Sequence, residues 1–126
     1  MLLGELRAGF PWGVLLVTDE ASTDEIPSWT SDEEQVTHSA TAAVARVMHQ
    51  DEGDVAVKVW DNRASVGGAL AFSGTLDLAS GVLRISDALG DSMVRIPLTV
   101  GPTMVEIYTD SAVEATRVDV VVSPQG

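Results

Sequence analysis

Cysteine is absent from this chain of 126 residues, and its absence removes several classes of function at once. Disulfide frameworks, thiolate metal centres and cysteine nucleophiles are all excluded. Cations are also scarce, because seven Lys and Arg stand against nineteen Asp and Glu, which gives a formal net charge of −12. Neutralising nucleic-acid phosphates requires cations, so we expect no nucleic-acid partner.

Long apolar runs are missing as well. No run approaches the roughly 18 residues of a membrane span, and Glu5 and Arg7 interrupt the N-terminal segment where a secretory peptide needs an unbroken apolar core. We therefore expect a cytoplasmic protein without membrane association. With 45 % hydrophobic residues and no low-complexity tract, residues 1–126 are expected to form one globular domain.

Catalytic motifs are equally absent. The chain has no Walker loop, dinucleotide-binding glycine motif, H-E-x-x-H or G-x-S-x-G. Its only histidines are His38 and His49, and nothing in the sequence places a third catalytic or metal-ligating group beside either. We predict no catalytic residues, no cofactor and no metal ligands, and hence a protein that is not an enzyme.

From Asp54 onward, apolar residues alternate with polar ones at period two, and turn residues follow at short intervals. The predicted strands lie at 55–60, 69–75, 83–85, 94–96, 105–107 and 118–122. Pro97 restricts its strand to a sheet edge or a strand end. Such short strands without long helices predict an all-β fold, an antiparallel β-sandwich of about seven to eight strands with at most one short helical turn. Parallel pairing is not expected, because the chain has no room for crossover helices.

The first half of the chain is harder to interpret. Residues 10–18 predict a strand that is apolar on both sides and therefore central or covered. Residues 31–50 are compatible with a helix or with a strand. The Ser31/Glu34 capping box and the helical spacing of the apolar residues favour a helix. The β-branched residues and the hairpin-like D-E-G-D that follows at 51–54 favour a strand. Trp12, Trp29 and Trp60 are expected in or at the edge of the core, with Trp60 partly wet.

Seven carboxylates and no Lys or Arg lie between Asp19 and Glu34. We expect this acidic run to be an exposed connection and not part of the core. It is either a solvated loop or an anionic recognition surface.

Several features appear in a recognisable order along the chain. Trp29-Thr30 precedes Asp32-Glu33-Glu34, two apolar stretches follow at 42–48 and 55–60, and S-G, V-L-R-I, V-R-I-P-L, G-P and M-V-E-I-Y come later. This order resembles the competence protein J family of small nuclease inhibitors. The resemblance implies a β-sandwich, a helical turn at about 31–36, a strand at about 40–49 paired with 55–60, and a protein that acts by binding another protein.

The favoured hypothesis is an acidic inhibitor or immunity-type protein that occludes the basic groove of a partner, such as a nuclease. The predicted partner-binding residues are Asp24, Glu25, Trp29, Asp32, Glu33 and Glu34. The alternative is a small-ligand or Ca²⁺-dependent binding module, with turn oxygens from Asp51, Asp54, Asp61 and Asn62 as candidate ligands. The oligomeric state stays open, and a homo-oligomer is compatible with the sequence.

Overall fold

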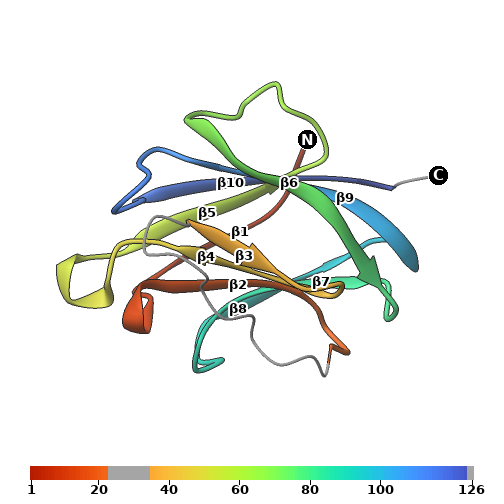
Figure 1. The fold of residues 1–126 in the computed structure, drawn as a ribbon, viewed down its shortest axis with the longest axis horizontal. Coiled ribbons are helices and arrows are strands. Elements are labelled where there is room, and N and C mark those ends of the chain that lie inside the picture. The colour runs from red at the N-terminus through yellow and green to blue at the C-terminus, as the bar shows by residue number, and fades with distance from the viewer. Residues whose placement is uncertain (23–34, 125–126) are drawn as a thin grey trace.

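The computed structural model describes residues 1–22 and 35–124, which form two five-stranded sheets packed face to face (Figure 1). The first sheet has the order β1 (Leu2–Ala8), β5 (Val55–Trp60), β10 (Arg117–Pro124), β9 (Gly101–Thr109) and β6 (Ala69–Leu78). The second has the order β3 (Val36–His38), β4 (Ala42–Arg46), β2 (Val14–Asp19), β7 (Val82–Asp87) and β8 (Met93–Pro97). Two 3₁₀ turns complete the described elements, η1 (Pro11–Gly13) and η2 (Gln50–Glu52).

The all-β sandwich predicted from the sequence is confirmed. The described residues form ten strands instead of seven to eight, and two short helical turns instead of one. The periodicity missed β1 because a register shift between Leu2 and Gly4 breaks the alternation of that strand. It missed β3 because three residues are too few to show a period. Within residues 35–50 the helix alternative is wrong, since this part of the chain forms β3 and β4.

The core lies between the sheets and follows the predicted facing. Val55, Val57 and Val59 of β5 point inward and are at most 1 % exposed. β2 is central, as its two-sided apolar pattern predicted, and lies between β4 and β7. Each buried aliphatic side chain of this size contributes about 1.5–3 kcal/mol to stability. β8 ends at Pro97 on a sheet edge, which also agrees with the prediction.

Two predictions about strand pairing are wrong. β4 and β5 do not form a hairpin, because β4 pairs with β2 and β3 while β5 belongs to the opposite sheet. The D-E-G-D segment at 51–54 begins within the η2 turn and carries the chain across from one sheet to the other. In addition, β5 and β10 pair in parallel, from Ala56↔Arg117 to Trp60↔Val121. No crossover helix is needed, since the four strands β6 to β9 make the return.

No helix in the described part of the chain has the length and hydropathy to cross a membrane. The predicted helical turn at 31–36 lies mostly outside the described residues, and its last residue, Val36, begins β3.

Candidate protein-binding surface

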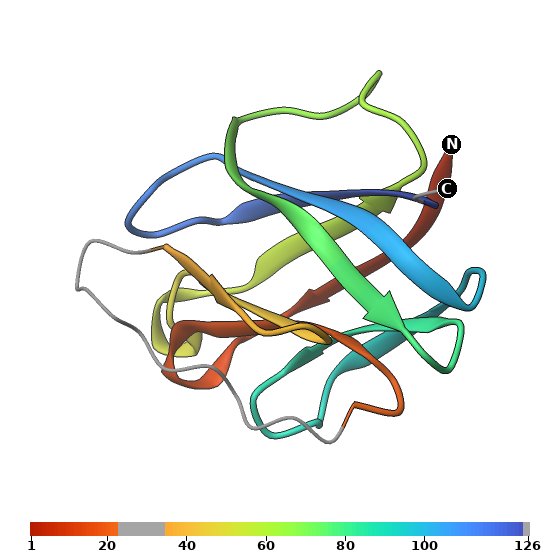
Figure 2. The ribbon, with the colours of Figure 1, turned by 45° about the vertical axis from the view of Figure 1, so that its right-hand side comes forward.

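Three chain connections meet at one end of the sandwich, opposite to the start of β1 and the end of β10 (Figures 1 and 2). They are η1 between β1 and β2, η2 between β4 and β5, and the 110–116 loop between β9 and β10. Backbone hydrogen bonds fasten them together. Val47 N donates to Gly13 O at 2.9 Å, and Met48 N donates to Ala115 O at 3.0 Å. These bonds make the end of the sandwich a fixed platform.

Trp12, on η1, projects from this platform and is 68 % exposed. Its backbone has φ 57° and ψ 10°, and it is the only residue other than glycine with positive φ in the described part of the chain. The left-handed conformation costs an L-residue about 1–2 kcal/mol. Gly13 follows with φ 63°, and a Cβ there would lie 2.6 Å from Val47 O, so only glycine fits.

The expectation that Trp12 belongs to the core or its edge is therefore wrong. Phe10, two residues earlier, is fully buried and takes the core position. The left-handed turn after Pro11 then directs the next side chain outward. The sequence did carry a signal for this arrangement, because an aromatic residue between proline and glycine lies in a turn.

A hollow of 390 Å³ opens beside Trp12. Val113, which is 79 % exposed, contributes apolar surface, and the acidic residues Asp51, Glu52 and Glu114 line the hollow with it. We call these five residues the Trp12 surface. No Lys or Arg of the described residues lines the hollow.

Little neutralises these carboxylates. His49 Nδ1 lies 3.5 Å from Asp51 Oδ2, while Glu52 and Glu114 have no ion pair within the described part of the chain. The Trp12 surface thus combines an exposed aromatic ring with uncompensated negative charge.

The loop that carries Glu114 is preorganised by its own hydrogen bonds. Asp110 accepts from Thr116 N at 2.9 Å and from Thr116 Oγ1 at 2.5 Å, and Ser111 Oγ accepts from Glu114 N at 3.2 Å. Partial burial acts to raise the pKa of Asp110, but the bonds from Thr116 and from the backbone of Arg117 outweigh it and hold this pKa below its usual value.

The acidic run is described only at its first four residues, 19–22. Asp19 ends β2 and is buried, accepting hydrogen bonds from Ser80 Oγ at 2.6 Å and Ser80 N at 3.2 Å. Glu20 pairs with Arg95 of β8. The expectation that no part of the run is core is therefore wrong at Asp19, where the carboxylate serves the fold.

The other residues predicted to bind a partner lie outside the described part of the chain; they are Asp24, Glu25, Trp29, Asp32, Glu33 and Glu34. Gln35 is the first residue after this segment that the structure describes, and its Nε2 donates a hydrogen bond to Ser111 O at 2.8 Å. Gln35 is thus joined to the loop that carries part of the Trp12 surface.

Comparison with known proteins bears on the fold. No protein-family model matches the chain, and no curated protein matches its sequence. Among solved structures, the chain is similar to ComJ, inhibitor of the DNA degrading activity of NucA, from Bacillus subtilis, with a TM-score of 0.74. The similarity covers 97 % of this chain and 96 % of the ComJ chain at 12 % sequence identity. The fold is that of ComJ. This likeness confirms, for the fold, the resemblance that the sequence indicated.

The histidines have local roles in this ComJ-like sandwich. His49 caps η2, since its Nδ1 accepts from Asp51 N at 3.1 Å. The exposed ring of His38 contacts Phe72, with ring centroids 4.9 Å apart.

The candidate calcium ligands are divided between the two ends of the sandwich. Asp51 lies within η2 and Asp54 follows it, whereas Asp61 lies at the far end and binds the N-terminal ammonium at 2.5 Å and Asn62 Nδ2 at 2.9 Å. The ammonium, by this hydrogen bond above all, lowers the pKa of Asp61. Within residues 1–22 and 35–124, no group of three or more metal-ligating side chains could hold an ion.

Trp60 lies half-buried on the outer face of its sheet, as predicted, and its Nε1 donates to Asp119 at 2.9 Å. Asp119 is 1 % exposed and also accepts from Arg117 Nε at 3.1 Å and from Gly67 N at 3.2 Å. These bonds hold the 61–68 loop on the sheet. The Trp60 indole is therefore occupied within the fold and is not a free binding platform.

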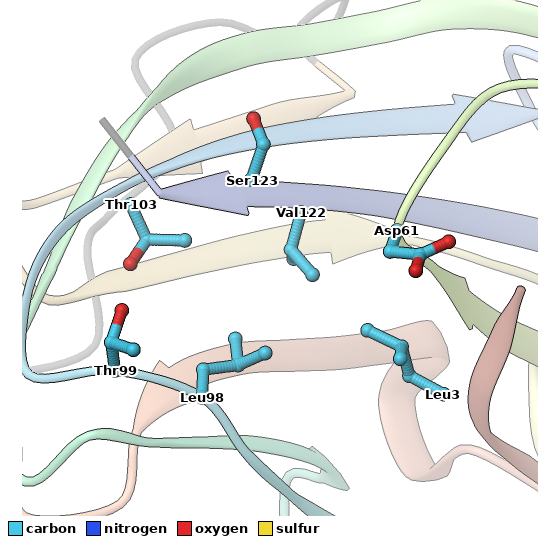
Figure 3. A pocket seen from close by; sticks show the side chains of 7 residues that line it. All are labelled: Leu3, Asp61, Leu98, Thr99, Thr103, Val122 and Ser123. Atoms are coloured by element: carbon cyan, nitrogen blue, oxygen red, sulfur yellow. The ribbon is translucent and has the colours of Figure 1, made fainter. Parts of the chain in front are cut away.

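At the far end of the ComJ-like sandwich lies an apolar pocket of 170 Å³ (Figure 3). Its walls are formed by aliphatic and hydroxyl side chains and one carboxyl; the lining residues are Leu3, Asp61, Leu98, Thr99, Thr103, Val122 and Ser123. This pocket is the feature that bears on the small-ligand alternative.

Proposed function

We propose that this protein is a non-catalytic, cytoplasmic inhibitor that binds a basic protein, a nuclease, and occludes its substrate groove. The observation that carries the proposal is the Trp12 surface. It combines an exposed tryptophan with three acidic residues, of which Glu52 and Glu114 have no ion pair within the described part of the chain. The ComJ-like fold supports it, because ComJ is an inhibitor of a DNA-degrading activity. The net charge of −12 supports it further.

The physical basis is competition for one receptor. A groove that binds DNA presents cations to phosphates, and clustered carboxylates on a rigid surface satisfy the same cations. Long-range attraction then speeds association, whereas a desolvated aromatic anchor sets the lifetime of the complex. We assign the anchor to Trp12, and we keep the acidic run, with Asp24, Glu25 and Trp29 among its members, as a second proposed contact.

The test measures both inhibition and binding kinetics. DNA degradation and surface-plasmon kinetics at two ionic strengths are followed for NucA of Bacillus subtilis and for the nuclease encoded nearest to this chain. Glu52→Gln/Glu114→Gln neutralises the Trp12 surface, and Asp24→Asn/Glu25→Gln neutralises part of the acidic run. Asp77→Asn/Asp91→Asn, at exposed carboxylates outside both, is the matched control.

The proposal expects inhibition by the unmodified protein, and slower association with a flatter salt dependence for the two test variants but not for the control. Absence of binding to either nuclease would refute the proposed function. Equal effects of all three variants would show that only net charge matters.

The small-ligand alternative has weaker support. Pockets that enclose drug-sized ligands measure about 300–1,000 Å³, whereas the apolar pocket at the far end has 170 Å³. A cavity of this size suits a molecule of about six carbon atoms.

A further inference from the structure

The hollow of the Trp12 surface has a mixed chemistry that restricts what can occupy it. One part is apolar, with the exposed indole of Trp12 and the exposed side chain of Val113. The rest is lined by three acidic residues, Asp51, Glu52 and Glu114, and is therefore anionic. An anion is repelled by such a lining, and a purely apolar group leaves the carboxylates without a counter-charge.

The group that suits both parts is a long side chain with an apolar stem and a cationic head. Lys and Arg have this form. Of the two, the guanidinium of Arg is planar, is more weakly hydrated and stacks on aromatic rings, while its fork of N–H groups pairs with carboxylates.

We infer that the hollow takes one arginine side chain of the bound partner, with the guanidinium stacked on the Trp12 indole and paired with Glu52 or Glu114. The inference rests on the proposed function for the source of the arginine. Its chemistry rests only on the lining of the hollow, so it can be tested without the nuclease.

The platform favours such an occupant because it is already formed. The hydrogen bonds from Val47 to Gly13 and from Met48 to Ala115 tie η1 and the 110–116 loop to the segment that leads into η2. The three connections that line the hollow are thereby held in place relative to one another. The Ser111 bond to Glu114 N positions one of the carboxylate-bearing residues. This protein therefore loses little conformational entropy when the partner's side chain binds.

The experiment is a titration of the ¹⁵N-labelled protein with N-acetyl-arginine amide, followed at the indole N–H resonances. Trp12→Phe assigns the Trp12 signal. N-acetyl-citrulline amide, which has nearly the same shape without the charge, is the ligand control. The Trp60 indole, bonded to Asp119, is the internal control.

We expect a saturable shift of the Trp12 signal with the arginine probe, and little shift with citrulline or at Trp60. Glu52→Gln/Glu114→Gln should weaken the binding by roughly threefold or more, while Asp77→Asn/Asp91→Asn should leave it unchanged. No shift at Trp12, or equal shifts with arginine and citrulline, would overturn the inference.

The outcome separates this inference from the proposed function. If the arginine probe binds at Trp12 but neither nuclease is bound, the proposed function fails and the arginine site stands. If a nuclease is bound and inhibited equally well by Trp12→Ala, the protein is an inhibitor and the inference about the hollow is overturned.

Discussion

Replacing Trp12 by asparagine should leave the free energy of unfolding within about 1 kcal/mol of the unmodified protein, because two effects oppose each other. The side chain is 68 % exposed, so about a third of it is covered. For an aromatic residue this is roughly 50–80 Å² of buried area, and its loss costs about 1–2 kcal/mol. Asparagine tolerates the left-handed region, and relief of the strain at φ 57° returns about 1 kcal/mol or more.

The assay is urea unfolding followed by far-UV circular dichroism, with Phe10→Ala as the matched control. Phe10 belongs to the same turn but is 0 % exposed. Its truncation leaves a cavity in the core and should cost about 3–5 kcal/mol. The two aromatic residues, two positions apart, should therefore differ by at least about 2 kcal/mol in their contribution to stability.

The reasoning fails if Trp12→Asn costs as much as Phe10→Ala. That result would mean that the indole is packed into the fold, and the Trp12 surface would lose its anchor. A second readout is independent of stability. Trp12→Asn should abolish the saturable shifts that the arginine probe causes at the backbone N–H resonances of Val113 and Glu114, which line the same hollow, while the protein stays folded.

Three further predictions concern the fold. Val57→Asp should unfold the protein or nearly so, because it buries an unpaired charge. Lys58→Asp, on the opposite face of β5, should lower the free energy of unfolding by less than about 1 kcal/mol. Equal shifts of the melting temperature for the two variants would contradict the assigned facing of β5. Asp119→Ala should lower the free energy of unfolding, measured in urea, by about 2–4 kcal/mol, because Trp60 Nε1 and Gly67 N lose their acceptor. Asp119→Asn should lower it less, and the reverse order of the two variants would refute this account. The stability gap between the unmodified protein and Asp110→Asn should be constant near neutral pH and shrink below about pH 4, since the pKa of Asp110 is lowered on folding; a gap that widens in acid would contradict this sign.

The sequence predicted strands and their facing best where alternation of apolar and polar residues extends over several positions. Alternation along β5 predicted which valines face the core, and the position of Pro97 predicted an edge strand. Pairing partners were not predictable in this way. The segment after β4 has the composition of a hairpin turn, yet the η2 turn sends the chain to the opposite sheet, because the choice between these paths depends on packing across the core.

The candidate surface shows the same limit. Aromatic residues are usually buried, so Trp12 was expected near the core, and only its place between Pro11 and Gly13 indicated otherwise. Asp19 shows the reverse case, because a carboxylate counted with a solvated run is buried against Ser80. Charge counts describe a segment, whereas burial is decided residue by residue by the available hydrogen-bond partners.

The strain at Trp12 gives a physical reason to connect this turn with binding. A residue other than glycine in the left-handed region persists only where its surroundings hold it, and here the bonds from Val47 N to Gly13 O and from Gly13 N to Phe10 O do so. The strain is borne by the free protein, so a partner meets an indole that is already presented. Salt should then act mainly on the association rate, through the carboxylates, and Trp12 mainly on the dissociation rate, through contacts made only in the complex. If Trp12→Asn instead slowed association and left dissociation unchanged, the indole would act before contact, which a short-range anchor cannot do.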